Sequence, residues 1–585
     1  MIDEAAPFIL LDDARAEGAG LLYRRGVKII EARRPDEVMP ALLLLREAAA
    51  QGLHAAGFVA YEAGHALEAK LAPLSAVAGA EDPPLLWFGL FKDVEQVSHV
   101  PSLLPDPNAG WTGPAGPRIE RAAYEASVAR VKEHIAAGNI YQANLAFPAE
   151  VLTAGHPLAV YAGVRRRAKA GHGAVVFTGE HWLLSFSPEL FFTLEQGQVT
   201  AQPMKGTAAR RQDPGQDAAE AHALRADPKQ RAENLMIVDL LRNDLSRVSR
   251  PGTVKVPSLF AVESYPTVHQ MTSTVTSELE EGLGAVDLIE AIFPCGSITG
   301  APKIRAMEII AEEEGRPRGV YTGSIGRIGP TGDASFNVAI RTLAIRAGES
   351  RALMGLGSGI VADSRAEEEW RECLAKGAFV SDPDRSFDLI ETMRFDPRDG
   401  IADIDRHLAR MKRSAEAFGF PFDRHGARNE IQAATFHLRE ARKVRLLLSR
   451  SGAVAIEVRP CAPGPARAVQ VAVAPLPVPS DDFRLRHKTT DRAFYDDARE
   501  RTGMFELVFE DEAGFLTEGS FTNIFVPRNG KLRTPPSSRG LLPGILRERL
   551  IASGEAEEAD LVAADLVDGF YIGNAARGLI PAVLR

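Results

Sequence analysis

The chain has little cysteine and no long apolar run, and these shortages exclude several classes of protein. Its three cysteines, Cys295, Cys373 and Cys461, lie far apart and form no CxxC pair, which disfavours both a disulfide framework and a zinc site. No stretch is long and apolar enough to span a bilayer. The first residues are acidic, whereas a secretory signal begins with basic residues. We therefore expect a protein of the reducing cytoplasm.

Positive charge is also in short supply. The chain has 68 lysines and arginines against 78 aspartates and glutamates, a formal net charge of −10, which argues against nucleic acid or a membrane surface as a partner. A hydrophobic share of 45% and a charged share of 25% are typical of a globular protein. The length of 585 residues allows about four folding units, or fewer large ones.

A polar segment at residues 381–386, SDPDRS, divides the chain. We expect one α/β domain over 1–380 and a second over 387–585. Residues 101–120 are rich in proline and glycine and predict a linker or long loop. Apolar spacing predicts a helix over 230–248 with Leu235, Val238, Leu241 and Leu245 on its buried face, whereas 335–345 and 352–362 each predict a strand.

One lysine stands among turn residues at 203–207, which read PMKGT. Lys205 is either a surface charge or an amine placed for chemistry. Two predicted helices carry carboxylates, Glu233 on one and Glu369 and Glu372, three residues apart, on the other. These oxygens could hold Mg²⁺, although a solvated helix face is the commoner use of such spacing.

Two glycine-rich stretches, 296–303 (GSITGAPK) and 356–364 (LGSGIVADS), predict turns whose backbone amides bind carboxylate or phosphate. Arg341 lies in an apolar segment, which we interpret as a strand, and is either half of a buried ion pair or an anion clamp. Together with the carboxylates, these features predict a site for a small dianion beside a metal ion.

Residues 1–380 resemble the chorismate-binding enzymes, most strongly from residue 120 onward. The motifs that carry the resemblance include GNIYQANLAF, FSPELFF, PMKGT, YPTVHQMTSTV, FPCGSITGAPKIRAMEII and GSGIVADS, in the family's order. The resemblance implies a large α/β sandwich around an Mg²⁺–chorismate site. It implies that Glu233 and Glu372 bind the metal with Glu369 behind them, and that His269 lies near the departing C4 hydroxyl. The implied chorismate contacts are Gln142, Gly206, Thr207, Ser297, Tyr321, Arg341, Gly357, Ser358, Gly359 and Lys376.

Two positions distinguish the outcomes within that family. Relatives that add water use a lysine base where this chain has Gln142, and glutamine cannot deprotonate water. Anthranilate synthases typically have alanine where this chain has Lys205, whereas aminodeoxychorismate synthases have lysine. The resemblance therefore implies that Lys205 is a covalent nucleophile that directs the amine to C4. One departure concerns Gln230, where relatives often carry an acid, and it places one water-mediated metal contact in doubt.

None of the three cysteines lies in the glycine-flanked elbow that a glutamine amidotransferase needs. We therefore expect ammonia to come from a separate amidotransferase subunit.

Residues 387–585 contain the parts of a pyridoxal phosphate site. These are a lysine before a helix (Lys488), an acid beside a glycine (Glu518), a helical arginine (Arg410) and a helix start at Gly544. Motifs such as LIETMR, HKTT, TEGSFTNIFV and LLPGILR resemble the fold type IV enzymes, and among these aminodeoxychorismate lyase. The resemblance implies two subdomains, a homodimer, Lys488 as the Schiff-base lysine and Glu518 on the ring nitrogen. It also implies that the phosphate is held by Arg410 and the amides of Ile545 and Leu546.

Together, the two resemblances predict a fusion that aminates chorismate and then releases pyruvate to give 4-aminobenzoate, a folate precursor. Two alternatives stay open at this point. One is an anthranilate-type synthase joined to a branched-chain or D-amino-acid aminotransferase, because those aminotransferases share the fold type IV skeleton. The other is that one half is a non-catalytic module.

Overall fold

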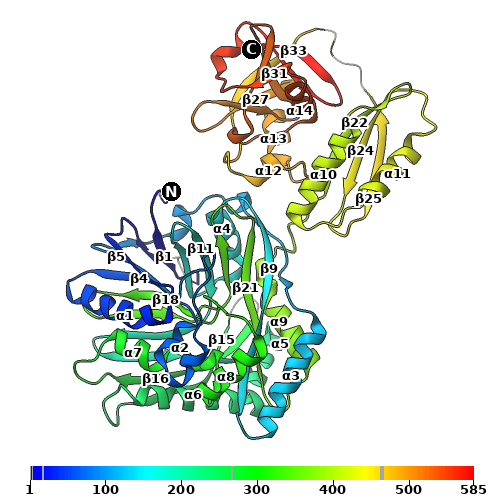
Figure 1. The fold of residues 1–585 in the computed structure, drawn as a ribbon. Helices are drawn as coiled ribbons and strands as arrows, with labels where there is room; N and C mark the ends of the chain where they lie inside the picture. Colours follow the sequence, from blue (N-terminus) through cyan, green and yellow to red (C-terminus); the bar gives the residue numbers. More distant parts are fainter. Residues whose placement is uncertain (1, 3, 16–18, 265–267, 462–464, 466) are drawn as a thin grey trace. The chain divides into compact units, whose positions relative to one another are not determined.

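The computed structural model describes residues 2, 4–15, 19–264, 268–461, 465 and 467–585. They form two compact units (Figure 1). Unit 1 contains residues 1–105, 114–151 and 161–381, and unit 2 contains residues 106–113, 152–160 and 382–585. Within the described ranges, no helix combines the length and the apolar character needed to span a bilayer.

Unit 1 is built on two large, mainly antiparallel sheets. The first has the order β17 (Gly300–Ala301), β9 (Gln142–Ala154), β21 (Arg351–Ile360), β20 (Thr342–Arg346), β11 (His181–Ser187), β10 (His172–Phe177), β1 (Phe8–Asp12), β2 (Gly20–Tyr23) and β6 (Glu95–Val97), and β8 (Gly116–Pro117) also pairs with β9. The second has the order β14 (Met204–Ala209), β16 (Val268–Glu278), β13 (Gln198–Gln202), β12 (Leu190–Glu195), β19 (Ala334–Asn337), β18 (Ser324–Ile328), β4 (His54–Val59), β5 (Leu86–Phe91) and β3 (Lys28–Ala32), and β15 (Lys255–Ser264) pairs with β16.

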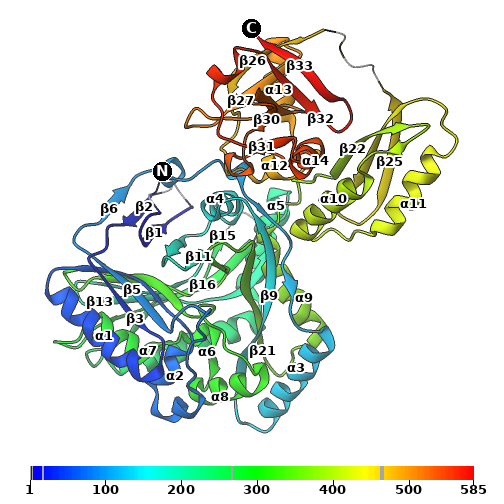
Figure 2. The ribbon, with the colours of Figure 1, turned by 45° about the horizontal axis from the view of Figure 1, so that its top comes forward.

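The two sheets enclose one apolar core, and helices enclose another. Ile9, Phe58, Trp87 and Leu183 come from strands of both sheets and pack together. On the second sheet, a larger core gathers side chains from α1, α6 and α7; the ribbons of these helices are seen in Figures 1 and 2. The helices of this part of the chain are α1 (Pro35–Ala50), α2 (Ala63–Leu67), α3 (Arg121–Ala136), α4 (Pro157–Ala168), α5 (Pro214–Ala226), α6 (Pro228–Ser246), α7 (Ala285–Ile292), α8 (Lys303–Glu314) and α9 (Ala366–Gly377). The predicted α/β class is therefore confirmed.

The helix predicted over 230–248 is present as α6, but one of its predicted core residues is wrong. Leu235 is 44% exposed, whereas Ile237, Val238, Leu241 and Leu245 are buried. Because a helix turns about 100° per residue, a buried face centred on Ile237 and Leu241 turns position 235 toward the surface.

The chain passes from one sheet to the other within residues 335–345, where the sequence predicts one continuous strand. The strand predicted over 335–345 is wrong, because β19 ends at Asn337 in the second sheet and β20 begins at Thr342 in the first. The same exchange occurs between β11, which ends at Ser187, and β12, which begins at Leu190. Alternation of side chains tells which residues face a core, but not which sheet a strand joins. Both crossing segments, 188–189 and 338–341, contribute residues to the cavity described below.

The proline-rich segment 101–120 is not a free linker. It contains short elements, namely η2 (Val100–Leu103), η3 (Pro107–Ala109), β7 (Trp111–Thr112) and β8, and residues 106–113 belong to unit 2. Trp111 is buried there, with its ring 4.9 Å from Phe418 and 6.2 Å from Phe387. The long-loop alternative fits this segment and the free linker does not, because composition does not show that one buried indole anchors it.

Unit 2 has a small sheet and a larger one. The small sheet has the order β23 (Gly400–Ile401), β22 (Leu389–Asp396), β24 (Arg442–Leu448) and β25 (Val454–Pro460). Helices α10 (Ile404–Phe418) and α11 (Arg424–Thr435) pack on its face that carries Val444 and Leu446 (Figure 1). The larger sheet has the order β28 (Leu516–Gly519), β27 (Glu506–Glu510), β26 (Val469–Pro475), β33 (Gly578–Leu584), β32 (Phe570–Asn574), β29 (Asn523–Arg528), β30 (Lys531–Thr534) and β31 (Ala556–Glu558). The remaining helices are α12 (Phe483–Arg486), α13 (Ala493–Thr502) and α14 (Ile545–Ala552).

Candidate active sites

A cavity of about 440 Å³ in unit 1 gathers most of the residues that the sequence predicts for a chorismate site. It lies where β14, α6, β21 and α9 meet the two segments in which the chain changes sheet. Residues that are far apart in the sequence therefore line the same cavity. The predicted residues that line it are Lys205, Gly206, Thr207, Glu233, Ser297, Tyr321, Arg341, Gly357, Gly359, Glu369, Glu372 and Lys376.

Lys205 is placed in this cavity by a constrained strand. Its neighbour Gly206 has φ 93°, and a Cβ at that position would lie 2.9 Å from Gln230 Oε1, so the residue after the lysine must be glycine. Burial, followed by the nearby ammonium of Lys376, lowers the pKa of Lys205, and the carboxylates of Glu189 and Glu233 partly oppose this. A lowered pKa makes more of the amine neutral and able to act as a nucleophile.

Glu189 is a residue of this site that the sequence reasoning missed. It lies in the first crossing segment and is 4% exposed, and Ser297 Oγ donates a 2.7 Å hydrogen bond to its Oε1. Burial raises the pKa of Glu189, which Lys205 and the Ser297 hydrogen bond partly oppose. A lone acid in the apolar run FSPELFF was the available signal, because a buried acid needs a partner.

The three predicted metal ligands face the cavity but do not converge. Glu372 is paired with Lys376 Nζ at 2.7 Å, and Glu369 accepts a 2.6 Å hydrogen bond from Ser364 Oγ. Burial raises the pKa of Glu233, although Lys205 opposes the effect. Among the described residues, no three acids, histidines or cysteines are grouped closely enough to hold a metal ion. Carboxylate oxygens fit Mg²⁺ chemically, so these glutamates could hold it after Glu372 and Glu369 leave their present partners.

The residues predicted to bind anions differ from the sequence prediction in two ways. Arg341 is not in a strand. It has φ 51° in the bend before β20, and its guanidinium carbon lies 5.8 Å from the centre of the Phe379 ring. Gly357 and Gly359 belong to strand β21, which confirms the strand predicted over 352–362 and not the turn predicted over 356–364. A Cβ at Gly359 would lie 2.5 Å from Gln142 Nε2, so this glycine serves close packing.

Three predicted residues do not line the cavity. Gln142 packs against Gly359, and its buried Oε1 has no hydrogen-bond partner in the described part of the chain. Ser358 Oγ lies 3.0 Å from Tyr124 Oη. His269 is buried with its Nε2 3.0 Å from Asp217 and its Nδ1 2.8 Å from Ser264 Oγ, while the neighbouring positions 268 and 270 line the cavity. Alternation along β16 therefore turns His269 to the other face.

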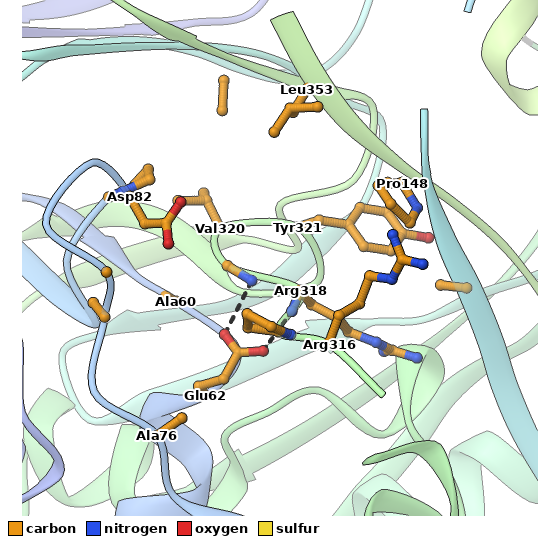
Figure 3. A pocket seen from close by; sticks show the side chains of 18 of the residues that line it. Ala60, Glu62, Ala76, Asp82, Pro148, Arg316, Arg318, Val320, Tyr321 and Leu353 are labelled. Carbon is orange, nitrogen blue, oxygen red and sulfur yellow. Dashed lines mark hydrogen bonds between the residues drawn. The ribbon is translucent and has the colours of Figure 1, made fainter. Parts of the chain in front are cut away.

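A second cavity of about 200 Å³ shares Tyr321, Met354 and Gly355 with the first. Figure 3 shows Glu62 among the residues that line it, where it accepts hydrogen bonds from the backbone amides of Arg318 at 2.6 Å and Gly319 at 3.0 Å. Burial raises the pKa of Glu62 to about 7. A Cβ at Gly355 would lie 2.1 Å from the Tyr321 ring, so this glycine permits the wall that the two cavities have in common.

In unit 2, Lys488 is held through its backbone and its amine is perturbed. The amide of Ile390 in β22 donates a 2.9 Å hydrogen bond to the Lys488 carbonyl. Burial, followed by the nearby Arg410 guanidinium, lowers the pKa of Lys488 to about 7. The amine is therefore suited to condensation with an aldehyde, which requires its neutral form.

Glu518 lies in β28 and is 4% exposed. Tyr495 Oη donates a 2.8 Å hydrogen bond to its Oε1, and burial raises the pKa of Glu518 to about 7. Glu506, which the sequence reasoning missed, fixes the turn after Glu518 by accepting hydrogen bonds from Ser520 N at 2.9 Å and Thr522 Oγ1 at 2.9 Å. The Glu518 carboxyl group, held by Tyr495 and by this turn, could bind the nitrogen of a pyridine ring.

A cation and a helix start provide a possible phosphate site. Arg410 Nη1 donates a 2.9 Å hydrogen bond to the carbonyl of Pro543, just before α14. Ile545 and Leu546 are the first residues of that helix, and the first amides of a helix have no partner within it. A Cβ at Gly544 would lie 1.9 Å from Asn523 Oδ1. These groups fit pyridoxal phosphate. The Lys488 amine suits its aldehyde, the Glu518 carboxyl group suits its ring nitrogen, and the Arg410 guanidinium with the first amides of α14 suits its phosphate.

The pKa of Lys488 predicts how cofactor uptake depends on pH. Below about pH 7 the amine is mostly protonated, and its neutral fraction falls about tenfold per pH unit. We expect the rate of pyridoxal phosphate binding to the cofactor-free protein to be level above about pH 8. Below about pH 7 this rate should fall about tenfold for each pH unit. Stopped-flow absorbance across pH 6–10 measures it, with N-acetyl-lysine as a control. A rate that keeps rising to pH 10 contradicts the lowered pKa.

Comparison with known proteins places the two units in families. Residues 8–382 match the model of the chorismate binding enzyme family. Because the match covers more than half of the chain, the chain belongs to that family. Residues 388–584 match the model of amino-transferase class IV, so the chain joins a chorismate-binding enzyme to a class IV aminotransferase domain.

Relatives of unit 1 include both kinds of amination enzyme. The chain is 43% identical over 258 residues to aminodeoxychorismate synthase component 1 of Klebsiella aerogenes, covering 44% of this chain and 57% of that protein. It is 41% identical over 268 residues to anthranilate synthase component 1 of Streptomyces coelicolor, covering 46% and 51%. It thus spans about half the length of the curated relatives it matches. The crystal structure of anthranilate synthase component I from Streptococcus pneumoniae superposes with a TM-score of 0.53 at 27% identity, covering 65% of this chain and 93% of that one.

Proposed function

We propose that unit 1 aminates chorismate at C4 and that unit 2 converts the product to 4-aminobenzoate and pyruvate. The observation that carries the first step is Lys205, an amine of lowered pKa in a cavity lined by acids and by Arg341 and Lys376. Chorismate is a dianion, and its two carboxylates match these cations. Identity to relatives does not separate amination at C4 from amination at C2, because both kinds of synthase match at similar identity.

The proposed chemistry of unit 1 uses two groups in turn. The neutral amine of Lys205 bonds to C2 of the ring, the double bonds shift, and the C4 hydroxyl leaves as water with a proton from Glu189. Ammonia then bonds to C4, the Lys205–C2 bond breaks, and the Glu189 carboxylate takes the proton that the new amine loses. The raised pKa of Glu189 suits both transfers. Glu233 and Glu372, with Glu369 behind them, would hold Mg²⁺, which supplies positive charge to oxygens of the substrate.

In unit 2, the proposed roles follow the positions of four groups. Pyridoxal phosphate, when bound, supplies an electron sink. Lys488 would hold the cofactor and move the proton at C4 of the substrate. Glu518 would bind the ring nitrogen, and Arg410 with the first amides of α14 would bind the phosphate. Loss of the C4 proton and release of the enolpyruvyl group as pyruvate leave an aromatic ring.

The second candidate is an anthranilate-type synthase joined to an aminotransferase. It is favoured by the match to the Streptomyces coelicolor enzyme and by the class IV family of unit 2. It makes anthranilate from chorismate and no pyruvate in unit 2, so the two candidates differ in their products.

Incubation of the purified chain with chorismate, ammonium, Mg²⁺ and pyridoxal phosphate tests the proposal. We expect 4-aminobenzoate and pyruvate in equal amounts, identified by mass. Leaving out pyridoxal phosphate should stop the reaction at 4-amino-4-deoxychorismate. Anthranilate as the main product would replace the proposal with the second candidate. Accumulation of 4-amino-4-deoxychorismate with pyridoxal phosphate present would point to a non-catalytic unit 2, and unchanged chorismate would point to a non-catalytic unit 1. We also propose that the chain forms a homodimer through residues 387–585. Sedimentation of the purified chain would test this proposal.

Glutamine alone is expected to be a poor nitrogen source for the pure chain. Burial raises the pKa of Cys295 to about 12, and burial also raises that of Cys373, so neither is a ready thiolate nucleophile. The amination rate should be substantial with ammonium and stay at background with glutamine. The loss of chorismate absorbance measures this rate. Addition of an unrelated glutaminase is the control and should restore the rate. Glutamine use equal to ammonium use by the pure chain would contradict the need for a separate amidotransferase partner.

A further inference from the structure

A buried acid that none of the proposed steps uses lies beneath Arg410. Glu391 is on β22, is 1% exposed, and accepts two hydrogen bonds from Arg410, from Nε at 2.8 Å and from Nη2 at 2.7 Å. His407 Nδ1 lies 2.6 Å from the same carboxylate. Burial raises the pKa of Glu391, but the charge of Arg410 and the contact with His407 outweigh it and hold this pKa well below its usual range. The acid is therefore ionised and held from two sides.

The contacts of Arg410 leave part of its guanidinium available. Arginine has five N–H groups, and Glu391 and the Pro543 carbonyl accept three of them. Within the described part of the chain the structure gives no partner to the other two, one on Nη1 and one on Nη2. A guanidinium fixed on one side presents its remaining donors in a defined direction, which suits bidentate binding of phosphate.

The strand that carries Glu391 also carries the anchor of Lys488. Ile390, the adjacent residue, donates its amide to the Lys488 carbonyl, and Thr489 bridges to Leu389. Two adjacent residues of β22 therefore fix two parts of the site. The backbone of Ile390 positions Lys488, and the side chain of Glu391 positions Arg410. His407 and Arg410 are three residues apart on α10 and share the helix face that reaches Glu391.

We propose that Glu391 and His407 are positioning residues that hold Arg410 to bind the phosphate of the cofactor. The inference rests on the proposed pyridoxal phosphate site of unit 2. Neither residue takes part in the chemistry. Their carboxylate–imidazole pair restricts the rotation of the Arg410 side chain, and Ile390 ties that geometry to Lys488.

The test compares the affinity of the full-length, cofactor-free chain for pyridoxal phosphate and for pyridoxal, which has no phosphate. Glu391→Gln keeps the shape but replaces one acceptor oxygen with an N–H₂ that faces the donors of Arg410 or His407. We expect this variant to bind pyridoxal phosphate on the order of tenfold more weakly and pyridoxal unchanged. His407→Gln should shift the same ratio in the same direction by less. The matched control is Asp405→Asn on α10, which removes a surface pair with Arg424 and Arg428.

The possible outcomes separate the inference from the proposed function. Equal weakening of both ligands, or no change in either, overturns the positioning role. Failure of the wild-type chain to bind pyridoxal phosphate overturns the cofactor site itself, which the wild-type absorbance titration reveals before any variant is measured. If thermal unfolding shows that Glu391→Gln does not fold, the His407→Gln variant tests the positioning role instead. The measured quantity is again its affinity for pyridoxal phosphate relative to pyridoxal.

Discussion

Replacement of Lys488 by alanine should separate the two activities. We expect 4-aminobenzoate and pyruvate formation to fall by on the order of 10³ or more, about 4 kcal/mol of transition-state stabilisation, because the amine of pKa about 7 is lost. The absorbance of the lysine-bound cofactor should also disappear. Chorismate consumption should continue, since its proposed residues lie in the other compact unit. The chain should accumulate 4-amino-4-deoxychorismate, measured by mass.

Two controls make this experiment decisive. Lys531→Ala removes an exposed lysine of the same unit and should leave both products unchanged. An independent aminodeoxychorismate lyase added to the Lys488→Ala reaction should restore 4-aminobenzoate. If the variant alone keeps its 4-aminobenzoate output, Lys488 is not the essential amine. If the wild type forms no pyruvate from the intermediate, unit 2 is not a lyase.

Replacement of Lys205 by alanine is expected to lower the formation of 4-amino-4-deoxychorismate by at least about a hundredfold. The reason is that the nucleophile and the block at C2 are lost together. We expect the residual amination to shift toward C2, so that an anthranilate-type product appears. Single-turnover assays with chorismate and ammonium, analysed by mass, measure both rate and product.

The control for Lys205→Ala is Lys255→Ala, which alters an exposed lysine of β15. It should keep the wild-type rate and product. Unit 2 of the Lys205→Ala chain should still convert supplied 4-amino-4-deoxychorismate, which shows that unit 2 is folded, and circular dichroism and thermal unfolding report the folding of unit 1. A Lys205→Ala variant with full rate and one product would contradict the nucleophile role.

Ordered motifs in the sequence predicted most of the residues that share the cavity of unit 1. Lys205, Glu233, Arg341 and Glu372 come from four separate segments, and all of them line it. Periodicity alone does not bring them together, because it gives local structure and not tertiary contacts. The resemblance to a family supplied the missing long-range information.

The errors arose where tertiary contacts set the local structure. Gly357 and Gly359 lie where the sequence predicted both a strand over 352–362 and a glycine-rich turn over 356–364, and the strand is what forms, with Gln142 packed against Gly359. His269 was expected near the substrate, but the register of β16 turns it away, and shifting a strand by one residue reverses every side chain. Glu189 and Glu391 were missed because an acid within an apolar run signals a buried carboxylate but does not show which partner holds it.

The segment that carries Trp111 limits the modularity of this protein. Trp111 lies before most of unit 1 in the sequence but packs with Phe387 and Phe418 in the core of unit 2. A gene split or protease cut near residue 381 would remove it from the C-terminal fragment. Loss of a buried tryptophan costs about 3–5 kcal/mol, a large part of the stability of an ordinary domain. The two halves are therefore interleaved, and recombination that exchanged one of them would have to carry this distant segment with it.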